Sequence, residues 1–289
     1  MNFIKYRFIF YFLSGFFLLF SLYNLTFYSL NLSREFLGGV DIEYISKLKE
    51  SENEKVVKDT FKDLTFNLSK NNNVYNLIFE TQVNEKYLSE FKAVMSVKDS
   101  NFNIIRQSVI SPTVGTELAQ KTLIAICISI ITIFVFVAYA FKNINSAFSA
   151  ILAMLHDTFI IIGFYSFFCH FYGAKVDLLF FTAVLTTLSF SLYDTIVVFD
   201  KIRENTKSPK FKNTADMLDY SIKQTFVRSL NNSLTIVLVI FTLLLFVEGP
   251  LYWFALSLLL GVIFGTYSSP FVAVPLFYDL RKLKKLFRF

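Results

Sequence analysis

Six long apolar runs restrict the folds that this chain can adopt. Each is roughly 20 residues long, which is the length at which a helix rising 1.5 Å per residue crosses a hydrocarbon layer of about 30 Å. Lipid offers no hydrogen-bond partners, so a spanning segment must satisfy its own backbone and is expected to be helical. The runs cover residues 8–30, 122–141, 147–168, 178–199, 232–247 and 251–278. The sequence therefore predicts an α-helical membrane protein with six transmembrane helices.

Composition supports this interpretation. Hydrophobic residues make up 54% of the 289 residues, above the share usual for a soluble domain. The first run follows Lys5 and Arg7, as the core of a secretory signal would. It is too long for a signal core, and no small-residue cleavage motif follows it, so we expect it to remain as a membrane anchor.

Basic residues outside the runs fall at alternate loops, counted from the N-terminus. Under the positive-inside rule these loops face the cytoplasm. Both termini are therefore predicted to be cytoplasmic and residues 31–120 to lie on the opposite side. Charged loops beside membrane spans are common, so we expect no nucleic-acid partner. The residues are Lys5, Arg7, Lys142, Lys201, Arg203, Lys207, Lys210, Lys212, Arg281, Lys282, Lys284, Lys285 and Arg288.

The segment between the first two runs has the pattern of a small α+β domain. In "GGVDIEYI", the residues Val40, Ile42 and Tyr44 alternate as in a strand, and "NVYNLIFETQV" and "FNIIRQSVI" also favour strands. Helices are predicted at 50–64 and 85–95, with a short strand at 65–68. The resulting β-α-β-β-α-β order is that of a ferredoxin-like domain. We expect a contact module, since no catalytic triad or phosphate loop occurs in it.

We therefore predict three parts. Residues 1–30 form a tail and the first span, 31–120 the extracytoplasmic α+β domain, and 121–289 the other five spans. The last part includes a cytoplasmic amphipathic loop at 201–230 and a basic C-terminal tail. In that loop an amphipathic helix on the inner membrane face is predicted from the helical spacing of Met217, Leu218, Ile222 and Phe226.

Cysteine and histidine are too few for a metal site or a disulfide framework. Cys127 lies within the second run, and Cys169 lies next to His170 at the end of the third. A structural zinc site needs about four such ligands close together. We expect no metal and no cofactor.

Ionisable residues inside the runs are costly in lipid and are therefore functional hypotheses. His156 and Asp157 lie about ten residues into the third run, roughly 15 Å deep. Asp194 lies about six residues before Asp200, roughly 9 Å from the end of the fourth run. Arg228 precedes the fifth run. Since successive helix residues point in different directions, His156 and Asp157 are expected on different faces of their helix.

The fourth run carries a stripe of small and polar residues at helical spacing, formed by Ala183, Thr187, Ser191, Asp194 and Val198. Phe190, Ile196 and Phe199 are expected to point elsewhere. The stripe should face protein or trapped water. We hypothesise that Asp194 pairs with Arg228, either as a proton-exchanging pair or as a static pair that locks the bundle.

Glycines mark close contacts. Gly261 and Gly265 in the sixth run form a small-xxx-small pattern that permits close helix packing, and Pro270 with Pro275 is expected to kink the lower half of that run. Gly38 and Gly39 either make a tight turn before a strand or bind a substrate backbone.

Six ordered blocks resemble the SecF family, the SecF subunits of the Sec protein-translocase accessory complex in the resistance-nodulation-division superfamily. "FLGGVDIEY" and "SPTVGTEL", which contains Gly115, are similar to the family's segments after span one and before span two. "AILAMLHD", "DTIVVFDKIREN", "QTFVRSLNNSLT" and "FALSLLLGVIFGTYSSPFVAVP" are similar to spans three to six. Where the family usually has Gly-Tyr-Ser and Asn-Asp-Thr, this chain has Ser189, Phe190, Ser191 and Tyr193, Asp194, Thr195.

The resemblance implies half of a pseudo-symmetric transporter in a bacterial inner membrane, or in an organelle of bacterial descent. It implies SecD, the SecYEG channel and unfolded preprotein as partners and the proton gradient as the energy source for late export. Asp194 and Arg228 fall on the family's proton-coupling positions. His156, Asp157, Thr187 and Ser191 are expected as auxiliary polar residues.

Three alternatives remain. A structural subunit could keep the fold without coupling, and a superfamily transporter could carry small molecules. An intramembrane aspartyl protease would use Asp157 and Asp194, but the glycine that such proteases carry near the second aspartate is absent from "AMLHD". We therefore expect no catalytic residues and no enzyme activity.

Overall fold

The computed structural model describes residues 3–62, 64–71, 74–79, 83–110, 112–141, 143–211 and 213–286. The chain divides into two compact units, of which the first combines Met1–Asn31 with Ala125–Phe289 and the second is Leu32–Ile124. We call them the membrane unit and the outer unit. Lys142, Lys212 and Arg288, three of the residues behind the predicted orientation, lie outside the described residues.

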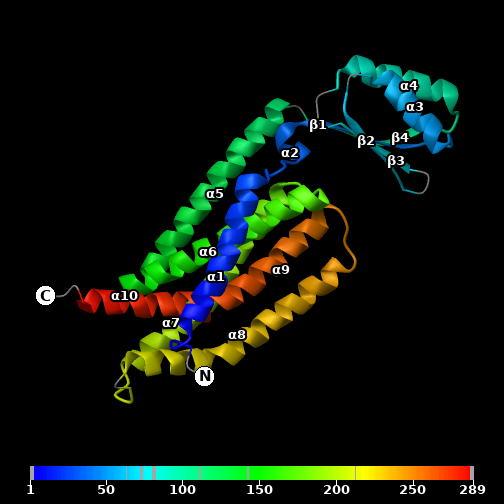
Figure 1. The fold of residues 1–289 in the computed structure, drawn as a ribbon. Helices are drawn as coiled ribbons and strands as arrows, with labels where there is room; N and C mark the ends of the chain where they lie inside the picture. Colours follow the sequence, from blue (N-terminus) through cyan, green and yellow to red (C-terminus); the bar gives the residue numbers. More distant parts are fainter. Residues whose placement is uncertain are drawn as a thin grey trace. The chain divides into compact units, whose positions relative to one another are not determined.

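The predicted six spans are confirmed, because the described residues contain six helices long and apolar enough to cross a membrane (Figure 1). Five of them are α1 (Arg7–Phe27), α5 (Pro112–Ala140), α6 (Ile144–Tyr172), α7 (Leu178–Thr206) and α8 (Thr214–Leu244). The sixth is α9 (Pro250–Ser268), which continues through the π-helical segment η1 (Ser269–Ala273) into α10 (Val274–Leu286). The chain changes direction between α9 and α10 (Figure 1), in the region where the sequence places Pro270.

The helices differ in how far they are buried within the membrane unit. At least half of the apolar window is buried in α6, in α7 and in α9 with α10, whereas only 6% of it is buried in α5. α7 and α9 lie against each other, and α1 packs along α6 through rings such as Phe20 and Phe164 (centroids 4.9 Å apart). The three most buried helices therefore form the centre of the membrane unit.

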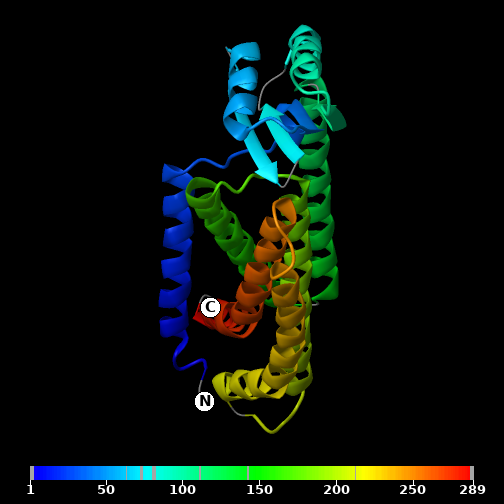
Figure 2. The same ribbon diagram turned by 90° about the vertical axis from the view of Figure 1, so that its right-hand side faces the viewer.

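α8 differs from the prediction in being one helix, where the sequence suggested an amphipathic helix followed by a separate span. Asn213 caps it by accepting a hydrogen bond from the Ala215 N–H at 3.1 Å. The helix bends on its way (Figure 2). Its early apolar residues, Met217, Leu218 and Ile222, are buried in the core of the membrane unit with Phe277. The apolar face that suggested membrane-surface binding is thus covered by the protein itself.

The outer unit has the predicted β-α-β-β-α-β order. Its elements are α2 (Arg34–Leu37), β1 (Gly39–Ile45), α3 (Glu50–Thr60), β2 (Phe66–Asn71), β3 (Val74–Phe79), α4 (Glu85–Lys98) and β4 (Asn103–Ile110). The strands pair antiparallel in the order β2-β3-β1-β4, which is the ferredoxin-like arrangement. Alternate strand residues such as Ile42, Tyr44 and Leu77 are buried together with Val57 of α3 and Phe91 of α4. The two helices therefore cover one face of the sheet.

Asp99 joins the end of α4 to the end of β1. Its Oδ2 accepts hydrogen bonds from Ser46 Oγ at 2.8 Å and the Lys47 N–H at 2.7 Å, and its Oδ1 accepts one from the Asn101 N–H at 2.9 Å. These donors, the Asn101 N–H first, hold the pKa of the Asp99 carboxyl below its ordinary value. Because the folded-state pKa is lowered, the stabilisation is present above the unfolded-state pKa of about 3.9 and is lost as the pH falls through the folded-state pKa.

Asp99→Asn should destabilise the outer unit at neutral pH by about 1–3 kcal/mol, because an amide nitrogen cannot accept hydrogen bonds from these donors. The substitution should also reduce the unit's loss of stability below about pH 4. Hydrogen exchange of the β1 and β4 amides in the full-length protein, corrected for intrinsic rates, measures both effects. The exposed Asp59→Asn in α3 is the control, and an unchanged acid response in the Asp99 variant would contradict the assignment.

Candidate functional site

The polar stripe predicted on the fourth span lies inside the membrane unit. Ala183, Thr187, Ser191, Asp194 and Val198 are all buried. Phe199, expected to point away, is also buried, because its ring packs between Phe141 and Phe277 at centroid distances of 5.3 and 5.5 Å. Ser189 and Tyr193, where the chain departs from the family pattern, are exposed and take no part in the buried contacts.

The stripe on α7 packs against the predicted glycines of α9. A Cβ added at Gly261 would collide with the side chain of Thr187, and one added at Gly265 would come within 3.1 Å of Ser191 Cβ. Both glycines therefore permit the close approach of the two helices. This contact places Ser191 beside α9.

The other predicted glycines belong to the outer unit. Gly38 and Gly39 have φ angles of 81° and 150°, in the region that favours glycine. A Cβ added at Gly39 would also collide with the Phe79 carbonyl oxygen, and one at Gly115 would lie 2.6 Å from the Phe36 carbonyl oxygen. Turn geometry and backbone packing thus account for all three.

Gly261→Ala should lower the stability of the membrane unit by about 1–3 kcal/mol, because the added methyl group overpacks the contact with Thr187. Gly15→Ala in α1 is the matched control, since nothing lies within 4 Å of its added Cβ. Thermal unfolding of the full chain in detergent compares the two variants. Equal midpoints would show that the α7 and α9 contact is looser than described.

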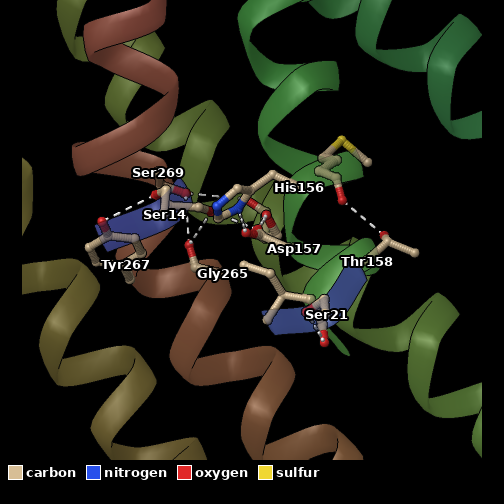
Figure 3. A network of polar contacts seen from close by, with 12 residues as sticks. Ser14, Ser21, His156, Asp157, Thr158, Gly265, Tyr267 and Ser269 are labelled. Atoms are coloured by element: carbon tan, nitrogen blue, oxygen red, sulfur yellow. Dashed lines mark hydrogen bonds and ion pairs between the residues drawn. The ribbon is translucent and has the colours of Figure 1, made fainter. Parts of the chain in front are cut away.

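Asp157 is the centre of a polar network that joins three helices (Figure 3). Ser191 Oγ of α7 and Ser268 Oγ of α9 each donate to Asp157 Oδ2 at 2.6 Å, and His156 Nδ1 lies 2.9 Å from Asp157 Oδ1. The expectation that His156 and Asp157 point to different faces is wrong. Both are buried, at 8% and 3% exposed, and the imidazole lies beside the carboxylate (Figure 3).

Two consecutive serines, the last residue of α9 and the first of the π-helical segment η1, take part in this network. Ser268 bonds to Asp157, whereas Ser269 Oγ lies 2.8 Å from Thr195 Oγ and donates to the Gly265 carbonyl at 3.1 Å. Neither serine is among the site residues predicted from the sequence. The sequence signal was a pair of hydroxyl residues before Pro270 within an apolar run. The structural signal is the π-helical turn that begins at Ser269, because π-bulges often occur at functional sites.

Ser268→Ala should destabilise the membrane unit by about 1–3 kcal/mol, because a buried carboxylate oxygen loses one of its two hydroxyl donors. Ser257→Ala provides the matched control on the same helix. Ser257 is also buried, but its hydroxyl donates to the Trp253 carbonyl of its own helix at 2.8 Å. Unfolding midpoints in detergent should separate the two variants, and similar midpoints would argue against a cross-helix role for Ser268.

Asp194 is buried but has far fewer hydrogen bonds than Asp157. Asp194 is 5% exposed, and its Oδ2 accepts one long hydrogen bond from Ser233 Oγ of α8 at 3.5 Å. Ser233 Oγ in turn accepts from Thr266 Oγ1 of α9 at 2.6 Å. Ser229 also faces the carboxyl group. Its Oγ is buried and has no hydrogen-bond partner among the described residues.

The hypothesis of an Asp194 and Arg228 pair is not met in this conformation. Within the described residues, no carboxylate oxygen lies within 4.0 Å of an Arg228 nitrogen. Arg228 is exposed and lines a hollow of about 1010 Å³ between the end of α7 and the early part of α8. Ser229 and Ser233 occupy the side of α8 that faces Asp194. Arg228 directly precedes Ser229, so its side chain leaves the helix about 100° away from that side.

Two small cavities separate Asp194 from that hollow. The first, about 10 Å³, is lined by residues that include Asp194, Ser233 and Thr266. The second, also about 10 Å³, includes Thr266, Ser229 and Thr225 in its lining, and Thr225 also lines the hollow with Arg228. Each volume is at the lower limit for one water molecule. The surroundings of the carboxylate and of the hollow are thus linked by two cavities that share hydroxyl-bearing lining residues.

No group of three or more histidine, cysteine, aspartate or glutamate side chains among the described residues is arranged to hold a metal ion. The site is instead two carboxylates on either side of the α7 and α9 contact, one fully hydrogen-bonded and one not.

The comparisons with known proteins agree with this architecture. The family model "Protein export membrane protein SecD/SecF, C-terminal" matches residues 90–283. The protein translocase subunit SecF of Sebaldella termitidis is 36% identical over 97% of this chain and 92% of its own length. The chain belongs to the SecF family. It is also 30% identical, over 96% of this chain, to SecF of Haemophilus influenzae.

Two longer proteins contain a region like this SecF chain. SecDF of Bacillus subtilis is 40% identical over 62% of this chain, which corresponds to 24% of the Bacillus protein. The crystal structure of SecDF from Thermus thermophilus, described as translocon-associated, matches 98% of this chain with a TM-score of 0.78 at 24% identity. This chain covers 39% of that structure, so the likeness concerns the fold of one part of a longer polypeptide.

Proposed function

We propose that this SecF chain uses the proton gradient, together with a SecD subunit, to drive late steps of protein export across a bacterial inner membrane. The SecD partnership is supported by the SecDF proteins, in which a region similar to this chain is part of one longer polypeptide. Contact with the SecYEG channel and with unfolded preprotein is proposed from the family and from the translocon association of the Thermus protein. In this proposal, both termini lie in the cytoplasm.

The observation that carries the proton-coupling role is the contrast between the two buried carboxylates. Asp157 accepts two hydrogen bonds of 2.6 Å and contacts His156 at 2.9 Å. Asp194 accepts one at 3.5 Å, a length at which a hydrogen bond is weak. A change of protonation at Asp157 would disrupt a cross-helix network, whereas Asp194 can gain or lose a proton without breaking strong hydrogen bonds. Asp194 is therefore proposed as the proton-exchanging group and Asp157 as a structural one.

The two cavities between Asp194 and the hollow give the proposed route by which a proton reaches Asp194. Ser229, Thr225 and Thr266 offer hydroxyl groups between Asp194 and the hollow that contains Arg228. Hydroxyls donate and accept at once, as a proton relay requires. A hydroxyl or single water in each small cavity would complete the connection.

Arg228 has a proposed role at the other end of this path. A guanidinium remains charged at any relevant pH, so it attracts Asp194 only while the carboxyl group is ionised. The proposed cycle alternates Asp194 between its present serine contacts and Arg228 as α8 moves. Proton binding to Asp194 would thereby drive movement of α8. Movement of the membrane-spanning helices would in turn change the conformation of the outer unit.

Asp194→Asn is expected to abolish the gradient-dependent increment in preprotein release, because the amide side chain cannot exchange a proton at physiological pH. The assay uses inverted vesicles that contain the SecD partner, with and without a proton gradient. Asp216→Asn, an exposed carboxylate in the first turn of α8 that lines neither hollow, is the control and should retain the increment. Co-purification with SecD should be equal in both variants.

The same experiment tests the alternative of a non-coupled structural subunit. Gradient-dependent release that persists in Asp194→Asn with intact assembly would favour that alternative. Loss of assembly in Asp194→Asn alone would assign the carboxylate to packing rather than coupling.

A further inference from the structure

A second hollow of about 510 Å³ lies between the α5–α6 connection, the last turns of α7 and α10. Its lining combines two kinds of side chain. Phe141, Phe199 and Phe277 are apolar and in mutual ring contact through Phe199. The polar part of the lining consists of Asn143, Asn145, Ser146, Asp200, Arg203, Thr206, Lys207 and Arg281.

The charges in this hollow favour an anion. Three cationic side chains, Arg203, Lys207 and Arg281, face one acidic side chain, Asp200. Arg203 Nη2 lies 3.2 Å from Asp200 Oδ1, so the single carboxylate is already engaged. In the described part of the chain, no carboxylate lies within 4.0 Å of Lys207 or Arg281. Two positive charges therefore remain for a ligand.

The aromatic part of the lining distinguishes a lipid from a soluble anion. Phe141 directly follows α5, and Phe199 ends the fourth apolar run one residue before Asp200. The hollow thus spans the change from apolar to polar sequence, the level at which phospholipid headgroups meet acyl chains. Basic pockets between membrane helices at this level are suited to anionic headgroups. A small soluble anion would gain nothing from the three aromatic rings.

We propose that this hollow binds the headgroup of an anionic glycerophospholipid. Its phosphate lies beside Arg203, Lys207 and Arg281, and its first acyl carbons lie against the half-buried Phe141, whose ring is backed by the buried Phe199. The proposal does not rest on proton coupling, since neither Asp194 nor Arg228 lines the hollow.

Three basic side chains from two segments that are distant in sequence line this one hollow, which distinguishes it from loops that are merely rich in basic residues. Arg203 and Lys207 come from the end of α7, whereas Arg281 comes from α10, more than 70 residues later in the sequence. Lys210, Lys223 and Lys282 are basic and exposed, yet none lines the hollow. These three lysines offer a control that removes the same charge from other positions.

The test is native mass spectrometry of the full-length protein in detergent, titrated with phosphatidylglycerol or phosphatidylethanolamine. The variant Arg203→Gln with Lys207→Gln and Arg281→Gln should weaken phosphatidylglycerol binding about tenfold or more, since each basic residue contributes to attraction of an anionic lipid. The control Lys210→Gln with Lys223→Gln and Lys282→Gln should bind like the wild type. Phosphatidylethanolamine should bind weakly to all three proteins.

Three outcomes would overturn the proposal. Equal weakening in both triple variants would assign binding to general surface charge. Displacement of phosphatidylglycerol by an equal concentration of inorganic phosphate would indicate a soluble anion as the ligand. Unchanged lipid binding in the Arg203, Lys207 and Arg281 variant would leave the hollow to another occupant, such as a partner chain. Should the triple variant fail to elute as a folded monomer, Arg281→Gln alone replaces it, with Lys282→Gln as its control and a loss of a few-fold expected.

Discussion

The close packing of α7 on α9 is the contact on which the membrane unit depends. Gly261 and Gly265 let the α9 backbone approach Thr187 and Ser191, and that approach brings hydroxyl groups of both helices within reach of Asp157. A bulkier residue at either glycine would separate the helices and deprive the carboxylate of its donors. Helix packing and satisfaction of a buried acid are therefore one requirement in this protein, because lipid supplies neither a hydrophobic driving force between helices nor alternative hydrogen-bond partners.

The same helix pair explains how the two buried carboxylates differ in character. Asp157 meets α7 and α9 on the side where both helices present serines. Asp194, itself on α7, faces α8 and meets one distant serine and a small cavity. α8 is also less buried than α7 or α9. The two sides of the helix pair thus differ in hydrogen bonding, with a three-helix network at Asp157 and a single long hydrogen bond at Asp194.

Much of the fold could be predicted from the sequence, because the length of an apolar run and the alternation of strand residues are local signals. The continuity of α8 could not, since hydropathy marks where a helix meets lipid and not where it ends. The partner of Asp194 could not be predicted either. Periodicity fixes which residues share a face of one helix, but the rotation of α8 against α7 decides whether Ser229 or Arg228 faces the carboxylate. The η1 segment changes the helical spacing after Ser268, so counting by α-helical turns fails there.

The two hollows at the end of α7 share part of their lining. Asp200, Arg203 and Lys207 face both the hollow with Arg228 and the hollow proposed to bind a lipid headgroup. An anion beside Arg203 and Lys207 would partly neutralise the positive potential around Arg228, because charges a few ångströms apart interact strongly where water is partly excluded. The proposed lipid site and the proposed proton path would then influence each other through these two side chains. This influence needs no conformational change, since the shared residues already line both hollows.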